Sequence, residues 1–89
     1  MTLVHDPRIM QVEMGLWIFQ NAAGREIGSL TAAERFDVAI GEVLNEARRR
    51  NAAKPHVAAW LKRAASRVPD DYIDTVVAPN GLRYPVDEF

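Results

Sequence analysis

The sequence predicts a single α+β domain in which a helical hairpin packs on antiparallel β-hairpins. Two segments, 31–50 and 55–68, have apolar residues at helical spacing. Two others, 16–30 and 72–86, are rich in β-branched and aromatic residues and are interrupted by glycine-containing turns. A chain of 89 residues with 48% hydrophobic content is typical of one folded domain and argues against intrinsic disorder.

The central segment, 31–50, is predicted to be an amphipathic helix. Thr31 and Glu34 have the Thr-x-x-Glu spacing of a capping box, which predicts the start of the helix at Thr31. Apolar residues recur at steps of four, three and four along one face. They are Phe36, Ile40, Val43 and Ala47. Gly41 is unfavourable inside a helix by about 1 kcal/mol, so we expect a neighbouring backbone to approach it closely.

The second helix is predicted to begin at Pro55, after a link over 51–54, and to end before Pro69. Its apolar stripe contains Val57, Trp60, Leu61, Ala64 and Val68. A short link favours antiparallel packing of the two helices. The predicted shared core is Phe36, Ile40, Val43, Trp60, Leu61 and Ala64.

The two predicted β-hairpins flank this helical pair. The first turns over residues 21–24, with Gly24 in a left-handed conformation. The second turns at Asn80-Gly81, the strongest short-range signal for a hairpin. Pro85 lacks a backbone donor, so its strand is expected at an edge of the sheet.

The N-terminal region has two interpretations. Asp6-Pro7 is a favourable helix start and Gly15 a favourable end, which predicts a short helix before the first strand. Alternatively, one helix continues from Pro7 to Gln20. A mainly α fold with a C-terminal β-hairpin is the alternative architecture, and its order of elements is similar to that of a winged helix. The central helix departs from that pattern, because no break separates a positioning helix from a recognition helix.

No residue pattern points to catalysis, a metal or a cofactor. The absence of cysteine excludes disulfides, thiolate nucleophiles and cysteine zinc sites. The acidic residues Asp70, Asp71 and Asp74 lack the spacing of a calcium loop. His5 and His56 have no nucleophile motif beside them, and we expect surface or capping roles for both. We therefore expect a protein that is not an enzyme and has no catalytic residue, metal ligand or cofactor.

The charged residues are segregated along the chain. Residues 1–47 contain three basic and seven acidic residues, whereas 68–89 contain one basic and five acidic residues. Between them, 48–67 contain seven basic residues and no acidic one. This basic block consists of Arg48, Arg49, Arg50, Lys54, Lys62, Arg63 and Arg67. It is the candidate partner-binding site, although the same charges also suit a helix C-terminus or pairing with the acidic flanks.

These observations favour a small, non-enzymatic interaction or regulatory protein. We expect it to bind a protein partner, or to self-associate, through apolar and opposed charge patches. The alternative is a nucleic-acid-binding regulator that uses the basic block. The sequence contains no apolar stretch of membrane-spanning length and no signal-peptide pattern, so we expect a cytoplasmic protein without a membrane partner.

Overall fold

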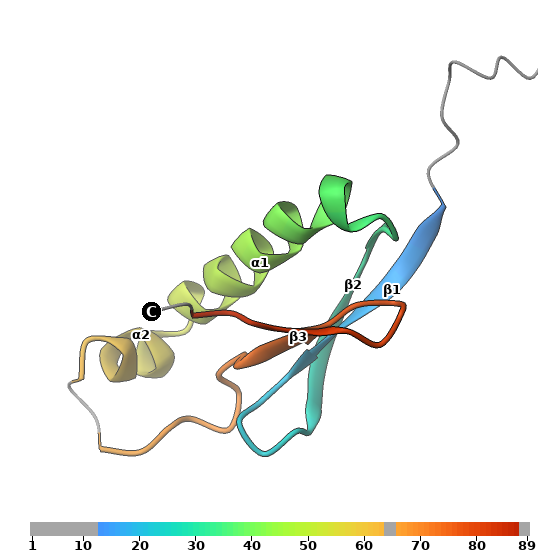
Figure 1. Cartoon of the computed structure of the whole chain (residues 1–89). Helices are drawn as coiled ribbons and strands as arrows, with labels where there is room; N and C mark the ends of the chain where they lie inside the picture. Colours follow the sequence, from blue (N-terminus) through green and yellow to red (C-terminus); the bar gives the residue numbers. More distant parts are fainter. Residues whose placement is uncertain (1–12, 64–65, 88–89) are drawn as a thin grey trace, which may run out of the picture.

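A computed structural model describes residues 13–63 and 66–87 and shows two helices with a four-stranded antiparallel sheet (Figure 1). The predicted α+β class is therefore confirmed. The elements in chain order are β1 (Met14–Gln20), β2 (Glu26–Ala33), α1 (Phe36–Ala53), α2 (Pro55–Leu61), β3 (Thr75–Val77) and β4 (Arg83–Pro85).

The sheet has the strand order β2-β1-β3-β4, so the first hairpin is at one side and the second at the other. Trp17 pairs with Leu30 between β1 and β2, and Ile18 pairs with Val77 between β1 and β3. Strand β4 forms one edge and contains Pro85, as predicted.

Residues 14–20 form the strand β1, which decides between the two interpretations of the N-terminal region. A helix continuing to Gln20 is wrong, and the predicted short helix lies outside the described residues, except for its end at Met14 and Gly15.

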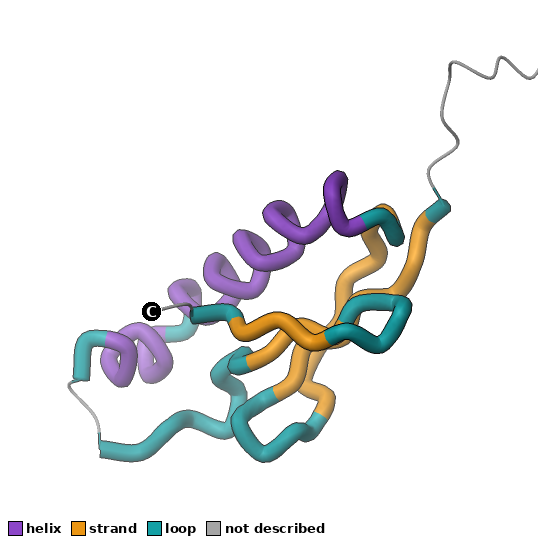
Figure 2. Tube along the Cα trace, viewed as in Figure 1, coloured by secondary structure: helices purple, strands orange, loops and turns teal. Residues whose placement is uncertain are grey.

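Both predicted turns are present (Figure 2). Gly24 has φ +81° and donates its N–H to the Asn21 carbonyl at 2.9 Å. Gly81 has φ +89° and donates to the Ala78 carbonyl at 2.8 Å. Glycine is favoured at both positions because a Cβ is disfavoured in this left-handed region.

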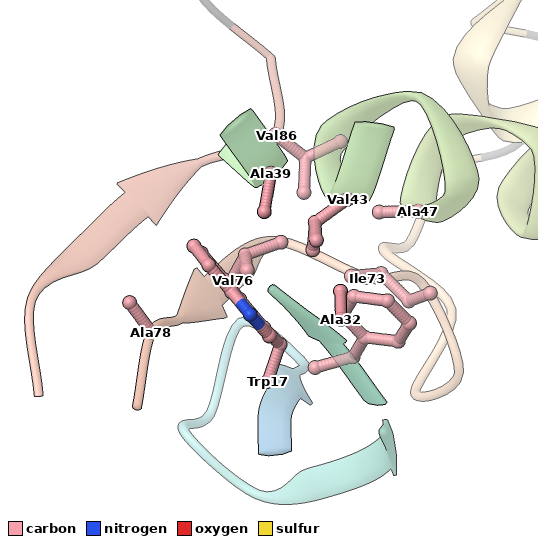
Figure 3. Packing of buried hydrophobic residues seen from close by; sticks show 10 residues of the cluster. Trp17, Ala32, Ala39, Val43, Ala47, Ile73, Val76, Ala78 and Val86 are labelled. Carbon is pink, nitrogen blue, oxygen red and sulfur yellow. The ribbon is translucent and has the colours of Figure 1, made fainter. Parts of the chain in front are cut away.

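The core lies between α1 and one face of the sheet. Trp17 and Phe19 alternate along β1 and are fully buried, and Val43 from α1 is also fully buried (Figure 3). The other members of the buried cluster are Ala32, Ala39, Ala47, Ile73, Val76, Ala78 and Val86. The structure thus confirms Val43 as a core residue and places Ile40 at the margin of the cluster, partly buried. The side chain of Phe36 lies outside the described part of the molecule.

Helix α1 begins later than predicted. Its N-cap is Arg35, and no side chain caps it there. Thr31 lies within β2, and the Glu34 N–H donates to the Glu13 carbonyl at 2.9 Å. The predicted capping box is therefore wrong, because strand pairing extends past Thr31 and the Glu34 N–H, which the box requires, is bonded to Glu13.

The second helix is shorter than predicted. Only Lys54 separates it from α1, and it lies at the C-terminal end of α1 (Figure 1). It ends at Leu61, whose side chain is 42% exposed, so the prediction of Leu61 as a core residue is wrong. Val68 lies beyond the helix and is also exposed. Ala64 falls outside the described residues.

Trp60 packs against the loop before β3 rather than joining the central cluster. It is partly buried, and its ring lies 4.6 Å from the ring of Tyr72, centroid to centroid. The buried side chain of Asn21 holds the same loop, because its Nδ2 donates to the Asp70 carbonyl at 2.9 Å.

A Cβ placed at Gly41 would have no atom of a neighbouring element within 4 Å, so the predicted close backbone approach at this glycine is wrong.

Candidate interaction surface

Four of the seven residues in the basic block are held by the fold itself. Arg48 donates from Nε and Nη2 to the Val86 carbonyl, at 3.0 and 2.7 Å. Lys54 donates from Nζ to the Asp71 carbonyl at 2.8 Å. These two side chains tie α1 and its end to the C-terminal segment and to the loop before β3.

Arg49 and Arg50 share one carboxylate. Arg49 binds both oxygens of Glu46, at 2.8 and 2.7 Å, and Arg50 Nε binds Glu46 Oε2 at 2.8 Å. Hydrogen bonds from Arg49 and then Arg50 lower the pKa of Glu46 from 4.5 to about 2. Arg50 also donates from Nη1 to the Ser29 carbonyl at 3.1 Å and lies 4.9 Å over the Phe19 ring. Glu46 therefore offsets part of the positive charge of Arg49 and Arg50 within the basic block.

The remaining members of the block are Lys62, Arg63 and Arg67. All three are exposed, and none forms an ion pair with another residue in the described ranges. Lys62 is the C-cap of α2, Arg63 follows it, and Arg67 lies in the connection to β3. The block is thus divided into four residues held by the fold, on α1 and at Lys54, and three residues at and after the end of α2 that form no ion pair among the described residues.

Two of the acidic residues before β3, Asp71 and Asp74, form side-chain hydrogen bonds. Asp71 accepts from His56 Nε2 at 2.8 Å, and this contact is the main cause of the lowered pKa of Asp71. Asp74 accepts the hydroxyl of Thr75 at 2.9 Å. In the parts of the chain that the structure describes, no group of three or more His, Cys, Asp or Glu residues is placed to hold a metal ion.

A groove lies between the edge of β2 and α1, and the sequence analysis did not identify it. Its volume is about 700 Å³. Its lining residues are Met14, Leu30, Thr31, Ala32, Ala33, Val38, Glu42, Asn45, Glu46 and Arg49. The exposed Met14 and Val38 supply apolar surface, and the polar residues come from α1 except for Thr31 of β2. Sequence periodicity misses such a groove because it depends on the separation of α1 from the strand edge.

The edge of β2 beside this groove has unpaired peptide groups. Because Glu34 N–H bonds Glu13 across the β1–β2 pair, the alternation of an antiparallel ladder turns the N–H and C=O of Thr31 away from β1. Ser29 and Ala33 face the same way. The hydrogen bond from Arg50 to the Ser29 carbonyl agrees with this assignment. No hydrogen bond joins the outward Thr31 groups to another described residue.

A second exposed apolar area lies on the face of the sheet away from α1. Leu16 is 54% exposed there, and the paired Ile18 and Val77 are partly buried beside it. This face has no free peptide groups on its inner strands, because the N–H and C=O groups of β1 and β3 are paired within the sheet. It therefore offers side-chain contact without free peptide groups, whereas the groove combines apolar, charged and backbone groups.

Comparison of the chain with protein-family models, curated proteins and solved structures finds no match. No helix among the described residues is long and apolar enough to cross a membrane. The function is therefore argued from the geometry of this chain alone.

Proposed function

We propose that this chain is a small, non-enzymatic interaction protein that binds a protein partner, or a second copy of itself, at the groove between β2 and α1. One observation carries the proposal: β2 is an eight-residue edge strand without proline or lysine, and it lies beside an apolar groove. Exposed edges of this length are usually blocked in proteins that stay free of partners. A regulatory role in the cytoplasm is part of this proposal, and cell fractionation tests the location.

Site-specific photocrosslinking tests the groove. Val38 and Leu82 are a matched pair, because they are apolar and 48% and 53% exposed, but only Val38 lines the groove. A photoreactive amino acid at Val38 is expected to crosslink a protein in extracts of the source cell, and the same group at Leu82 is not. Equal yields at both positions would show that the groove has no special role.

Light scattering after size-exclusion chromatography separates the two kinds of occupant. Self-association through the groove gives a dimer whose dissociation depends on protein concentration. A strict monomer across the accessible concentration range removes the second copy and leaves a different protein as the partner.

Nucleic-acid binding is the second candidate function, and it rests on Lys62, Arg63 and Arg67. These three cations are exposed and unpaired among the described residues, so they are available for phosphate groups. Fluorescence anisotropy with duplex and single-stranded oligonucleotides in a salt series tests this. The expected affinity falls steeply with salt and is reduced in Lys62→Ala/Arg67→Ala. Absence of binding at low salt would eliminate this function.

A further inference from the structure

We infer that the occupant of the groove is an extended peptide segment of a partner protein, which adds to β2 as a fifth strand and places a lysine or arginine against Glu42. This inference rests on the proposed function and specifies its binding mode. Three independent properties of the groove support it: the backbone of β2, the side chains of the lining and the charge of the rim.

The backbone supplies the first property. Thr31 presents a donor and an acceptor at the strand edge, and Ser29 and Ala33 each add an outward N–H on either side. Their carbonyls are already used, because Ser29 accepts from Arg50 and Ala33 accepts from Trp17 Nε1 at 3.0 Å. An added strand therefore pairs chiefly around Thr31, which is an arrangement that a helix or a folded surface does not satisfy.

The side chains of the lining supply the second property. Leu30 and Ala32 lie on the α1 side of β2, so alternate side chains of an added strand point towards α1 and enter the groove. There they meet Val38, which is 48% exposed in the free protein. Burial of these side chains stabilises the complex and favours apolar residues at every second peptide position.

The rim supplies the third property. Glu46 is neutralised by Arg49 and Arg50, whereas Glu42 forms no ion pair with any residue in the described ranges. Arg49 and Arg50 are both held by Glu46, so Glu42 is the charged lining residue that remains without an ion pair among the described residues. A basic side chain on the peptide complements it, and an acidic one is repelled.

Arg50 limits where the strand can pair. Its guanidinium covers the Ser29 carbonyl and is anchored by Glu46 and the Phe19 ring. The peptide is thereby directed towards Thr31 and Ala33, which is also the end of the groove lined by Met14 and Val38. The position of Glu42 in the next turn of α1 after Val38 places its charge beside the same stretch.

The test uses the full chain and a short synthetic peptide in which valine and threonine alternate around one lysine. The control peptide has glutamate in place of that lysine. Binding is measured by fluorescence anisotropy, and the contact site by amide chemical shifts of the isotope-labelled protein. We expect the lysine peptide to shift the amides of Ser29 to Ala33 and of Val38 to Glu42, and to protect the Thr31 amide from exchange. We expect weaker binding of the glutamate peptide.

Two matched pairs of variants test the mechanism. Thr31→Pro removes the outward N–H without breaking a bond to β1, whereas Thr31→Val keeps the backbone donor. Loss of the donor is expected to weaken binding about tenfold in the first variant only.

The second pair tests the charge: Glu42→Lys is compared with Asp70→Lys, which makes the same charge change outside the groove. Only Glu42→Lys is expected to abolish the preference for the lysine peptide. The melting temperature of each variant checks that it is folded.

Each contrary result has a distinct meaning. Unchanged binding in folded Thr31→Pro overturns strand addition, while crosslinking from Val38 still supports a partner in the groove. Absence of any shift at β2 with either peptide also overturns the inference. A dimer that Thr31→Pro dissolves assigns the edge to a second copy and overturns the assignment to a partner's peptide. Absence of crosslinking from Val38 instead contradicts the proposed function itself.

Discussion

The side-chain amide of Asn51 forms two hydrogen bonds with the backbone of Ile73. Asn51 Oδ1 accepts from the Ile73 N–H at 2.8 Å, and Asn51 Nδ2 donates to the Ile73 carbonyl at 3.1 Å. The asparagine is 1% exposed, so the pair is shielded from water. It replaces the strand partner that Ile73 lacks and joins the last turn of α1 to the loop before β3.

Replacement of Asn51 is expected to destabilise the domain strongly. Asn51→Leu leaves both peptide groups of Ile73 buried and unpaired, which costs roughly 2–4 kcal/mol of unfolding free energy. Urea denaturation measures this loss. Asn45→Leu, at an exposed position of the same helix, is the control and should change stability by less than about 0.5 kcal/mol. A similar small effect at Asn51 would contradict a structural role for the pair.

Alanine is expected to have opposite effects at two glycines. A Cβ at Gly15 would lie 2.5 Å from Pro79 Cγ and 2.6 Å from Glu34 Cγ, and the proline ring cannot rotate away. Gly15→Ala should therefore reduce the unfolding free energy by about 1–3 kcal/mol. Apart from the adjacent backbone of its own helix, a Cβ at Gly41 would meet no atom within 4 Å, so Gly41→Ala should increase the unfolding free energy by about 1 kcal/mol through helix propensity. Thermal unfolding of both variants tests the pair, and equal shifts would refute it.

The Glu46 carboxylate should make the stability depend on pH in the acidic range. Its pKa in the folded state is lowered to about 2 from 4.5, so its contribution is complete above 4.5 and is lost as the pH falls towards 2. The stability difference between wild type and Glu46→Gln should therefore shrink over this range. Denaturant titrations at several pH values measure it. A difference that stays constant from neutral pH to about 2 would show that the Arg49 and Arg50 contacts do not form in solution.

The end of α2 contains a strained residue. Arg63 has φ 61° and donates its N–H to the Trp60 carbonyl at 2.7 Å, which is a left-handed helix end without glycine. Arg63→Gly removes the steric cost of the Cβ and should stabilise the domain by about 1 kcal/mol. Lys62→Gly removes the same charge at φ −85° and should destabilise it. Hydrogen exchange at the end of α2, with the melting temperature, distinguishes the two. Equal destabilisation by both changes would argue against a left-handed Arg63.

The hairpins were predictable from the sequence because their signals are local. Gly24 and Gly81 have the positive φ values that their turn sequences require, and Pro85 lies on an edge strand. The start of α1 was not predictable from Thr31 and Glu34. Both residues have the local pattern of a helix cap, but pairing with β1 continues to Ala33 and determines their conformation.

The extent of the second helix and the internal pairing within the basic block both depend on distant contacts, which a local sequence pattern does not contain. The apolar period continues through Val68, yet the helix ends at Leu61, Arg63 has a positive φ and Val68 is exposed. Charge alone could not separate Arg48, which binds the Val86 carbonyl, from Lys62, which is free among the described residues. Asn51 likewise has the composition of a link, and only Ile73 gives it a buried role.

The two margins of the sheet differ in length and in chemistry. Strand β4 has three residues, includes Pro85, and is followed by a Val86 carbonyl that Arg48 occupies, whereas β2 is long and open. A molecule that accepts a strand on one side only cannot propagate into a linear polymer, because its far side offers no template for the next chain. In the strand addition that we propose, assembly at β2 would therefore end after one added strand, and this would limit the growth of fibres.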